Sequence, residues 1–131
     1  MIRLMLVDDH EIVRTGLRAM FELESDMEVA GEAGDGEGAV AAAERLKPDV
    51  VVMDIRMGGG IDGIDACRRL KSQRPETAVL MLTSFGTDEA VFAALMAGAS
   101  GFLLKNTGRA DLLRAVRLVA EGQWLLDPAV T

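Results

Sequence analysis

Five side chains that can do chemistry stand at the ends of short apolar runs in this sequence. They supply three carboxylates, one hydroxyl and one ammonium group: Asp8, Asp9, Asp54, Thr83 and Lys105. An aspartate after an apolar run is often only a turn residue or a helix cap, so Asp54 taken alone decides nothing. The five groups together would form a reactive site. Whether they can meet depends on the elements that carry them.

The chemistry of such a group of side chains is restricted. Crowded carboxylates repel one another unless a cation or a proton intervenes. Two or three carboxylates with water suit a hard cation such as Mg²⁺, which prefers oxygen ligands. A carboxylate can also act as a nucleophile on phosphorus, while a metal, a lysine and a hydroxyl neutralise the charge on the transferred oxygens. Each part that such a phosphoryl transfer requires is present once among these residues.

Apolar runs alternate with helical patterns along the sequence, which is typical of repeated β-α units and of a parallel sheet buried on both faces. Strands are expected at residues 2–7, 28–33, 50–53, 78–82 and 101–104. Helices are expected after the first strand and at residues 37–46, 62–73, 88–97 and 109–121. Parallel strands point the same way, so the residues that follow them gather at one edge of the sheet. The five reactive groups are therefore predicted to converge.

Length and composition indicate one folded domain. The chain has 131 residues, of which 50% are hydrophobic, and this length suits a single core. No apolar run approaches the roughly 20 residues of a membrane span, and the start lacks a signal peptide. The single cysteine, Cys67, forms no internal disulfide, which predicts a cytoplasmic location. The net charge of −7 disfavours non-specific binding to nucleic acid.

Four motifs end four of the expected strands in a specific order: LVDDH, VVVMDIRM, LMLTS and FLLK. Through them, residues 2–122 resemble the receiver domain of two-component response regulators. VDDHEIVRTGL and GASGFLLK look most like the NarL/LuxR-type subfamily. The resemblance implies an α/β fold: a doubly wound five-stranded parallel sheet, in the flavodoxin-like order 2-1-3-4-5, with five flanking helices. It also implies a receiver domain at residues 1–122, followed at 123–131 by a tail or the start of a linker.

The resemblance further implies a role for each residue of the site. Asp54 would accept a phosphoryl group from a sensor histidine kinase. Thr83 would bind the phosphoryl oxygens and move on activation, Lys105 would pair with those oxygens, and Phe102 would change rotamer. Mg²⁺ is the implied cofactor, and Asp9 is favoured as its direct ligand. The implied ligands are Asp8, Asp9, Asp54 and the backbone carbonyl of Arg56.

The implied output is control of transcription through a helix-turn-helix effector domain, which this sequence does not encode. Contact with DNA would come only through that domain, and no contact with a membrane is expected. A homodimer formed on phosphorylation is a further implied partner. Arg56 stands two residues after Asp54, where a phosphohydrolase would have its acid/base. A phosphoryl-aspartate should therefore hydrolyse slowly, which suits a signal and not a turnover enzyme.

Two positions depart from the usual pattern of the family. A proline normally stands four residues after the acceptor, but here Gly58 replaces it, and the loop to Gly63 is one residue longer. Three consecutive glycines, 58–60, carry a large ordering entropy, so this loop is expected to be mobile. On that expectation, Gly58→Pro should tighten Mg²⁺ binding modestly. Asn106 stands where many receivers have a proline, so the usual reason for a cis peptide bond is absent.

Three other functions compete with this interpretation. A flavodoxin-like cofactor binder would need a loop rich in Ser, Thr or Gly after the first strand, but that loop is DDH, whose charge repels phosphate without a metal. A phosphohydrolase acting through an aspartyl-phosphate usually has an acidic residue where Arg56 stands. A receiver-shaped interaction module that is never phosphorylated would not need all five groups. Each alternative fits the residues less well than a phosphoaccepting receiver.

Several other residues are expected to be structural. His10, at a helix start beside a hard-metal site, is assigned to the surface and not to metal binding or phosphoryl donation. Cys67 lies on an apolar helical face and is assigned to the core. Trp124 is expected to cover apolar surface, with a contact to a partner or linker as the alternative. A solvated face, not a nucleic-acid patch, is assigned to the arginines of the last helix: Arg109, Arg114 and Arg117.

Overall fold

The computed structural model describes residues 1–84 and 86–126 and confirms the predicted alternation of strands and helices. The strands are β1 (Ile2–Val7), β2 (Met27–Ala33), β3 (Val50–Met53), β4 (Ala78–Thr83), β5 (Gly101–Leu104) and β6 (Leu125–Leu126). The helices are α1 (Glu11–Glu22), α2 (Gly36–Leu46), α3 (Gly63–Gln73), α4 (Asp88–Met96) and α5 (Arg109–Ala120). Each boundary that the sequence predicts lies within one residue of the observed boundary.

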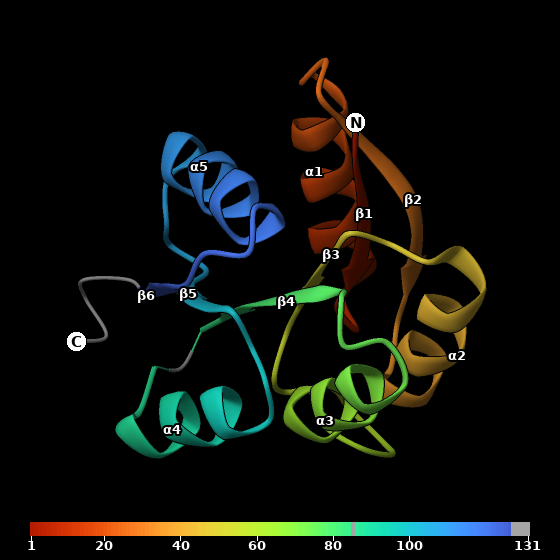
Figure 1. Cartoon of the computed structure of the whole chain (residues 1–131), viewed down its shortest axis with the longest axis vertical. Coiled ribbons are helices and arrows are strands. Elements are labelled where there is room, and N and C mark those ends of the chain that lie inside the picture. The colour runs from red at the N-terminus through yellow and green to blue at the C-terminus, as the bar shows by residue number, and fades with distance from the viewer. Residues whose placement is uncertain (85, 127–131) are drawn as a thin grey trace.

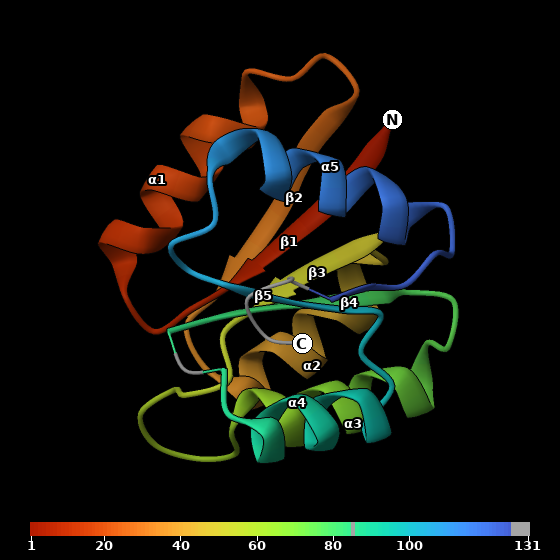
Figure 2. The same cartoon turned by 90° about the vertical axis from the view of Figure 1, so that its left-hand side faces the viewer.

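The strands form one parallel sheet in the order β2-β1-β3-β4-β5-β6. The first five strands follow the predicted order 2-1-3-4-5, and β6 adds two residues beside β5. Helices α1 and α5 cover one face of the sheet, and α2, α3 and α4 cover the other (Figure 1 and Figure 2). This doubly wound arrangement brings the carboxyl ends of the strands to a common edge.

Both faces of the sheet are buried, because successive side chains of a strand point to opposite sides. Met5, Val51 and Met81 pack in the cluster under α2, α3 and α4. Leu6 and Val52 pack in the opposite cluster, under α1 and α5. Every residue of β3 and β4 is buried. Strands buried on both sides read as continuous apolar runs, and this is why the sequence alone marks them so clearly.

The helices end where the sequence indicates. Gly98 (φ 102) and Gly122 (φ 86) follow α4 and α5 in a left-handed conformation that favours glycine. Before Pro48, Lys47 leaves the right-handed helical region and adopts a left-handed conformation (φ 51, ψ 57). Its amide still donates to the carbonyl of Ala43 at 2.9 Å, which closes the last turn of α2. No helix among residues 1–84 and 86–126 is both long and apolar enough to cross a membrane.

The residues after α5 differ from a simple tail. Leu125 and Leu126 pair with Gly101 and Phe102 as β6. Leu125 packs against the apolar cluster under α1 and α5. Trp124 is 69% exposed, so the expectation that it covers apolar surface is wrong; the next residue, Leu125, makes the apolar contact. The rest of the expected tail, residues 127–131, lies outside the described residues.

Candidate functional site

Backbone hydrogen bonds between neighbouring strands bring the strand ends together. The Asp54 amide donates to the carbonyl of Val7 at 2.9 Å, which places Asp54 at the end of β3 beside the end of β1. The Lys105 amide donates to the carbonyl of Thr83 at 2.8 Å, which places Lys105 beside the end of β4. The predicted convergence of reactive groups therefore follows directly from the pairing of β1 with β3 and of β4 with β5.

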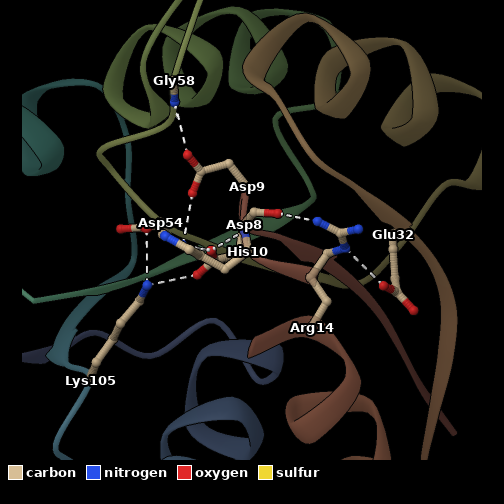
Figure 3. A network of polar contacts seen from close by, with 8 residues as sticks. All are labelled: Asp8, Asp9, His10, Arg14, Glu32, Asp54, Gly58 and Lys105. Carbon is tan, nitrogen blue, oxygen red and sulfur yellow. Dashed lines mark hydrogen bonds and ion pairs between the residues drawn. The ribbon is translucent and has the colours of Figure 1, made fainter. Parts of the chain in front are cut away.

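Lys105 is the cation at the centre of this edge. Its Nζ donates to Asp8 Oδ2 at 2.7 Å and to Asp54 Oδ2 at 3.0 Å (Figure 3). Asp8 and Asp54 are only 2% and 5% exposed, so burying their charges without a partner would be costly. The two contacts join residues that lie 97 and 51 positions apart in the sequence. The ammonium group thus supplies part of the neutralisation that the crowded carboxylates require.

This environment shifts the pKa values of Asp8 and Lys105 in opposite directions. Burial raises the pKa of Asp8, but hydrogen bonds from Lys105 and His10 outweigh burial, so this pKa lies below its ordinary value. Burial lowers the pKa of Lys105, but its hydrogen bonds to Asp8 and Asp54 outweigh that effect and raise the pKa. Near neutral pH the contact therefore joins a carboxylate to an ammonium ion.

Asp9 is more open than Asp8 and is held from two sides. Its Oδ2 accepts a hydrogen bond from the Gly58 amide at 3.0 Å, and its Oδ1 lies 2.9 Å from Nδ1 of His10. The same nitrogen of His10 lies 2.9 Å from Asp8 Oδ1. The His10 side chain is 64% exposed, so it lies at the surface as predicted. The imidazole also bridges two carboxylates, a contact that local sequence reasoning missed; its only signal was the position of His10 directly after the acidic pair.

Four side chains present metal-ligating atoms close together. A carboxylate oxygen from each of three aspartates and a ring nitrogen lie within 4.8 Å of one another: Asp8, Asp9, Asp54 and His10. Hard cations such as Mg²⁺ prefer carboxylate oxygens, so the three aspartates fit the predicted cofactor. Arg56, whose backbone carbonyl is the remaining predicted ligand, lies in the exposed part of the loop after β3.

The two residues predicted to switch are buried. Thr83 is 1% exposed at the end of β4, and Phe102 is fully buried in the cluster under α2, α3 and α4. Phe102 pairs with Met81 across β4 and β5. Protein interiors are close-packed, so a rotation of the Phe102 ring would require its neighbours to move. The roles of Thr83 and Phe102 in switching stay predictions.

A polar network between α1 and β2 supports the backbone of Asp8. The guanidinium group of Arg14 donates to the carbonyl of Asp8 and, through Nε, to Glu32 Oε1 at 2.9 Å (Figure 3). Glu32 also accepts a hydrogen bond from Arg18 at 2.6 Å. Nothing in the sequence links Arg14 to Glu32, because the contact depends on how α1 packs against β2.

The loop after Asp54 ends at Gly63, which lies against the backbone of Asp54 and Ile55. A Cβ atom at Gly63 would lie 2.1 Å from the carbonyl oxygen of Asp54 and 2.8 Å from the Cα of Ile55. The Gly63 amide donates to the carbonyl of Ile55 at 2.8 Å. The side chain of Asp62 caps α3 by accepting a hydrogen bond from the Asp65 amide at 2.8 Å. The start of α3 is therefore packed directly against the backbone that carries Asp54.

Two further residues lie where the sequence indicates. Cys67 is fully buried, and burial raises the pKa of its thiol to about 12, so it is a core residue and not a nucleophile. Its Sγ donates to the carbonyl of Ala97 at 3.6 Å. Asn106 lines an open pocket beside Lys105, together with Ser84 and Leu104. The described part of the chain contains no cis peptide bond, which agrees with asparagine at this position.

Known proteins share this sequence pattern. The family model described as the response regulator receiver domain matches residues 4–117. The response regulator protein VraR of Staphylococcus aureus is 42% identical over 129 residues, which cover 98% of this chain and 61% of VraR. This chain therefore spans about three fifths of the length of that relative.

Solved structures share the fold. A two-component response regulator of the LuxR family from Aurantimonas sp. SI85-9A1 aligns with a TM-score of 0.93 and 33% identity, covering 98% of this chain and 91% of the other. The signal receiver domain of NarL from Mycobacterium tuberculosis aligns with a TM-score of 0.88 and 34% identity, covering 93% of this chain and 98% of the other. The overall fold is thus common to these proteins.

Proposed function

This chain belongs to the response regulator receiver domain family, and from that premise we propose that Asp54 accepts a phosphoryl group from a sensor histidine kinase. Members of the family are signalling proteins of two-component systems that work with sensor kinases. The observation that carries the assignment is the position of Lys105 Nζ, within hydrogen-bond distance of both Asp8 and Asp54. A nucleophilic carboxylate, an acidic neighbour and a cation for the transferred group are thus present together.

The proposed reaction is a displacement at phosphorus. A carboxylate oxygen of Asp54 forms a bond to phosphorus while the bond between phosphorus and the histidine nitrogen of the kinase breaks. The electron pair of the broken bond stays with the imidazole nitrogen. Lys105 Nζ, 3.0 Å from Asp54 Oδ2, can pair with the transferred oxygens, and the Thr83 hydroxyl is proposed to bind them as well.

Receiver domains of this family bind Mg²⁺ at an acidic pocket, and the carboxylates of Asp8, Asp9 and Asp54 fit this ion. When bound, Mg²⁺ supplies positive charge for the phosphoryl oxygens and offsets the repulsion among the carboxylates. The backbone carbonyl of Arg56 is proposed as the remaining protein ligand. Asp9 is proposed as a direct ligand, because its side chain is more open than those of Asp8 and Asp54.

The output lies beyond the receiver itself. We propose that residues 1–122, together with β6 at the edge of the sheet, form the receiver domain and that the residues from there to 131 begin a linker to a helix-turn-helix domain that controls transcription. VraR, of which this chain covers only 61%, leaves room for such a domain. A homodimer on phosphorylation, a slow loss of the phosphoryl group and a cytoplasmic location belong to the same proposal. Contact with DNA would come from the effector domain.

Incubation with acetyl phosphate and Mg²⁺, followed by intact-mass measurement, tests the assignment of Asp54. The wild-type chain should gain the mass of one phosphoryl group, and Asp54→Asn should gain none. Chelation of Mg²⁺ should prevent the gain, because the carboxylates then lack the cation that offsets their repulsion. A mass gain by Asp54→Asn equal to that of the wild type would move the acceptor elsewhere.

A further inference from the structure

We propose that the backbone amide of Gly58 orients Asp9 for Mg²⁺, an inference that rests on the proposed function and specifically on Asp9 as a metal ligand. Gly58 stands where the family usually has a proline, which has no N–H to donate. The contact between this amide and Asp9 is therefore impossible in a receiver with proline at that position. It gives the departure from the family pattern a function.

The geometry assigns different tasks to the two oxygens of Asp9. Oδ2 accepts the hydrogen bond from the Gly58 amide at 3.0 Å, across 49 positions of sequence (Figure 3). Oδ1 is directed inward, 2.9 Å from the His10 nitrogen that also contacts Asp8. Fixing the outer oxygen restricts rotation of the carboxylate and presents the inner oxygen to the cluster. Groups that hydrogen-bond to ligating carboxylates tune metal affinity in this way.

The glycine loop is built to hold that amide in place. The Ile61 amide donates to Glu37 Oε1 at 2.8 Å, which ties the far end of the loop to α2. Gly60 is left-handed (φ 66), and a Cβ atom there would lie 2.5 Å from Glu37 Oε1. Gly59 is also left-handed (φ 71). The three glycines thus allow a tight path for the loop, which contacts Glu37 at one end and Asp9 at the other.

This geometry reverses the expected effect of Gly58→Pro. Proline would lower the ordering cost of the loop, but it would also remove the N–H that Asp9 accepts. Gly58→Ala is the matched control, because alanine restricts the backbone and keeps the N–H. Gly58 lies outside the left-handed region, and a Cβ atom there would meet Asp9 Oδ2 at 3.6 Å, an ordinary contact. The difference between the two variants isolates the amide.

Calorimetric titration with Mg²⁺ tests the proposal on the full chain. Gly58→Ala should bind Mg²⁺ within about twofold of the wild type, whereas Gly58→Pro should bind about tenfold more weakly than Gly58→Ala, at the lower end of the range for such supporting contacts. Equal affinities for the two variants, or tighter binding by Gly58→Pro, would overturn it. Phosphorylation of the wild type by acetyl phosphate in the same preparation tests Asp54 as the acceptor separately from the role of the Gly58 amide. If Asp54 is phosphorylated while the affinities are equal, only the role of Gly58 fails.

Hydrogen exchange tests the hydrogen bond between the Gly58 amide and Asp9 without changing the loop. This test still applies if Gly58→Pro does not fold. Without Mg²⁺, Asp9→Ala should speed exchange of the Gly58 amide severalfold. The Ile61 amide, held by Glu37, should keep its rate and serves as the control within the same loop. No change at Gly58, or an equal change at both amides, would show that Asp9 and Gly58 do not act as a pair.

Discussion

Charge balance governs the site at the scale of single residues. Asp8 and Asp54 share the ammonium group of Lys105, while His10 lies between Asp8 and Asp9. Each group has a partner, so the cluster is tolerated in the folded protein although its members repel one another. Removing one partner should therefore affect stability and metal binding together.

Lys105→Met tests this balance, because it keeps the apolar stem and removes the charge. Without metal, Asp8 and Asp54 lose their common donor, so the free energy of unfolding should fall by about 2 kcal/mol. Saturating Mg²⁺ should reduce the difference from the wild type, because the ion binds the folded state and stabilises the variant more once no ammonium group competes with it for the carboxylates. Urea denaturation with and without Mg²⁺ measures both effects.

Lys71→Met is the control for that experiment. Lys71 Nζ donates to the backbone carbonyls of Pro75 and Thr77 and lies away from the carboxylate cluster. Its replacement should lower stability without any recovery that depends on Mg²⁺. If Mg²⁺ leaves the loss of stability in Lys105→Met unchanged, Lys105 and Mg²⁺ do not both neutralise the same carboxylates.

Among the contacts between elements, the packing of α3 against the end of β3 fixes the position of Asp54. Gly63→Ala would drive a Cβ atom into the Asp54 carbonyl, which lies 2.1 Å from its ideal position. Backbone must shift, so we expect a loss of about 1–3 kcal/mol or more in the free energy of unfolding. Phosphorylation by acetyl phosphate should slow at the same time, because the shift moves Asp54.

Gly16→Ala, within α1, is the matched control for Gly63→Ala. An added Cβ atom at Gly16 meets nothing within 4 Å, and alanine favours the helix over glycine by about 1 kcal/mol. Gly16→Ala should therefore be neutral or stabilising and should leave phosphorylation unchanged. Equal stability of the two variants would contradict the close approach of α3 to β3.

The hydrogen bonds that Glu32 of β2 accepts from Arg14 and Arg18 of α1 should make the free energy of unfolding depend on pH. Hydrogen bonding from Arg18 lowers the pKa of Glu32; burial opposes this shift, and Arg14 adds to it. A lowered pKa means that the contribution is complete above the ordinary value of 4.5 and is lost as the pH falls through the lowered value. Glu32→Gln should cost about 1 kcal/mol at neutral pH and progressively less below pH 4.5. A deficit that stayed constant during acid titration would contradict this.

Two arginines of α5, Arg109 and Arg117, connect this helix to the turn between α1 and β2. Arg109 pairs with Glu24 at 2.7 Å. Arg117 pairs with Glu24 at 2.8 Å and with Asp26 at 2.9 Å. These side chains already bind carboxylates, and the chain carries a net charge of −7. The prediction that they do not form a nucleic-acid patch is consistent with these contacts.

Coupling between the site and the face formed by α4, β5 and α5 can be tested through Thr83. Thr83→Ala should still accept phosphate at Asp54, but hydrogen exchange around Phe102 should respond less to phosphorylation. A ligand shifts a conformational equilibrium only through contacts that differ between the two states, and the hydroxyl supplies one. Ser84→Ala, at the exposed neighbouring position, should respond like the wild type. An equal response in all three proteins would exclude Thr83 as the coupling residue.

The local sequence pattern determined the positions of the strands, of many core residues and of the residues at the strand ends. Strands buried on both faces appear as apolar runs, and the residue after each run is visible in the sequence. Asp8, Asp54 and Lys105 could therefore be placed at one edge of the sheet before any distance was known, because parallel strands share a direction. Core residues such as Cys67 followed from helical periodicity.

Only the tertiary structure decided which groups actually touch. The hydrogen bond from the Gly58 amide to Asp9 and the bond between Arg14 and Glu32 both depend on how separate elements pack. The exposure of Trp124 depends on β6, a strand of two residues with no periodic signal of its own. Such contacts join side chains and loop amides from different elements, and their geometry is set by packing in three dimensions. A pattern along one segment carries information about that segment's buried face, but none about the partner that packing brings to it.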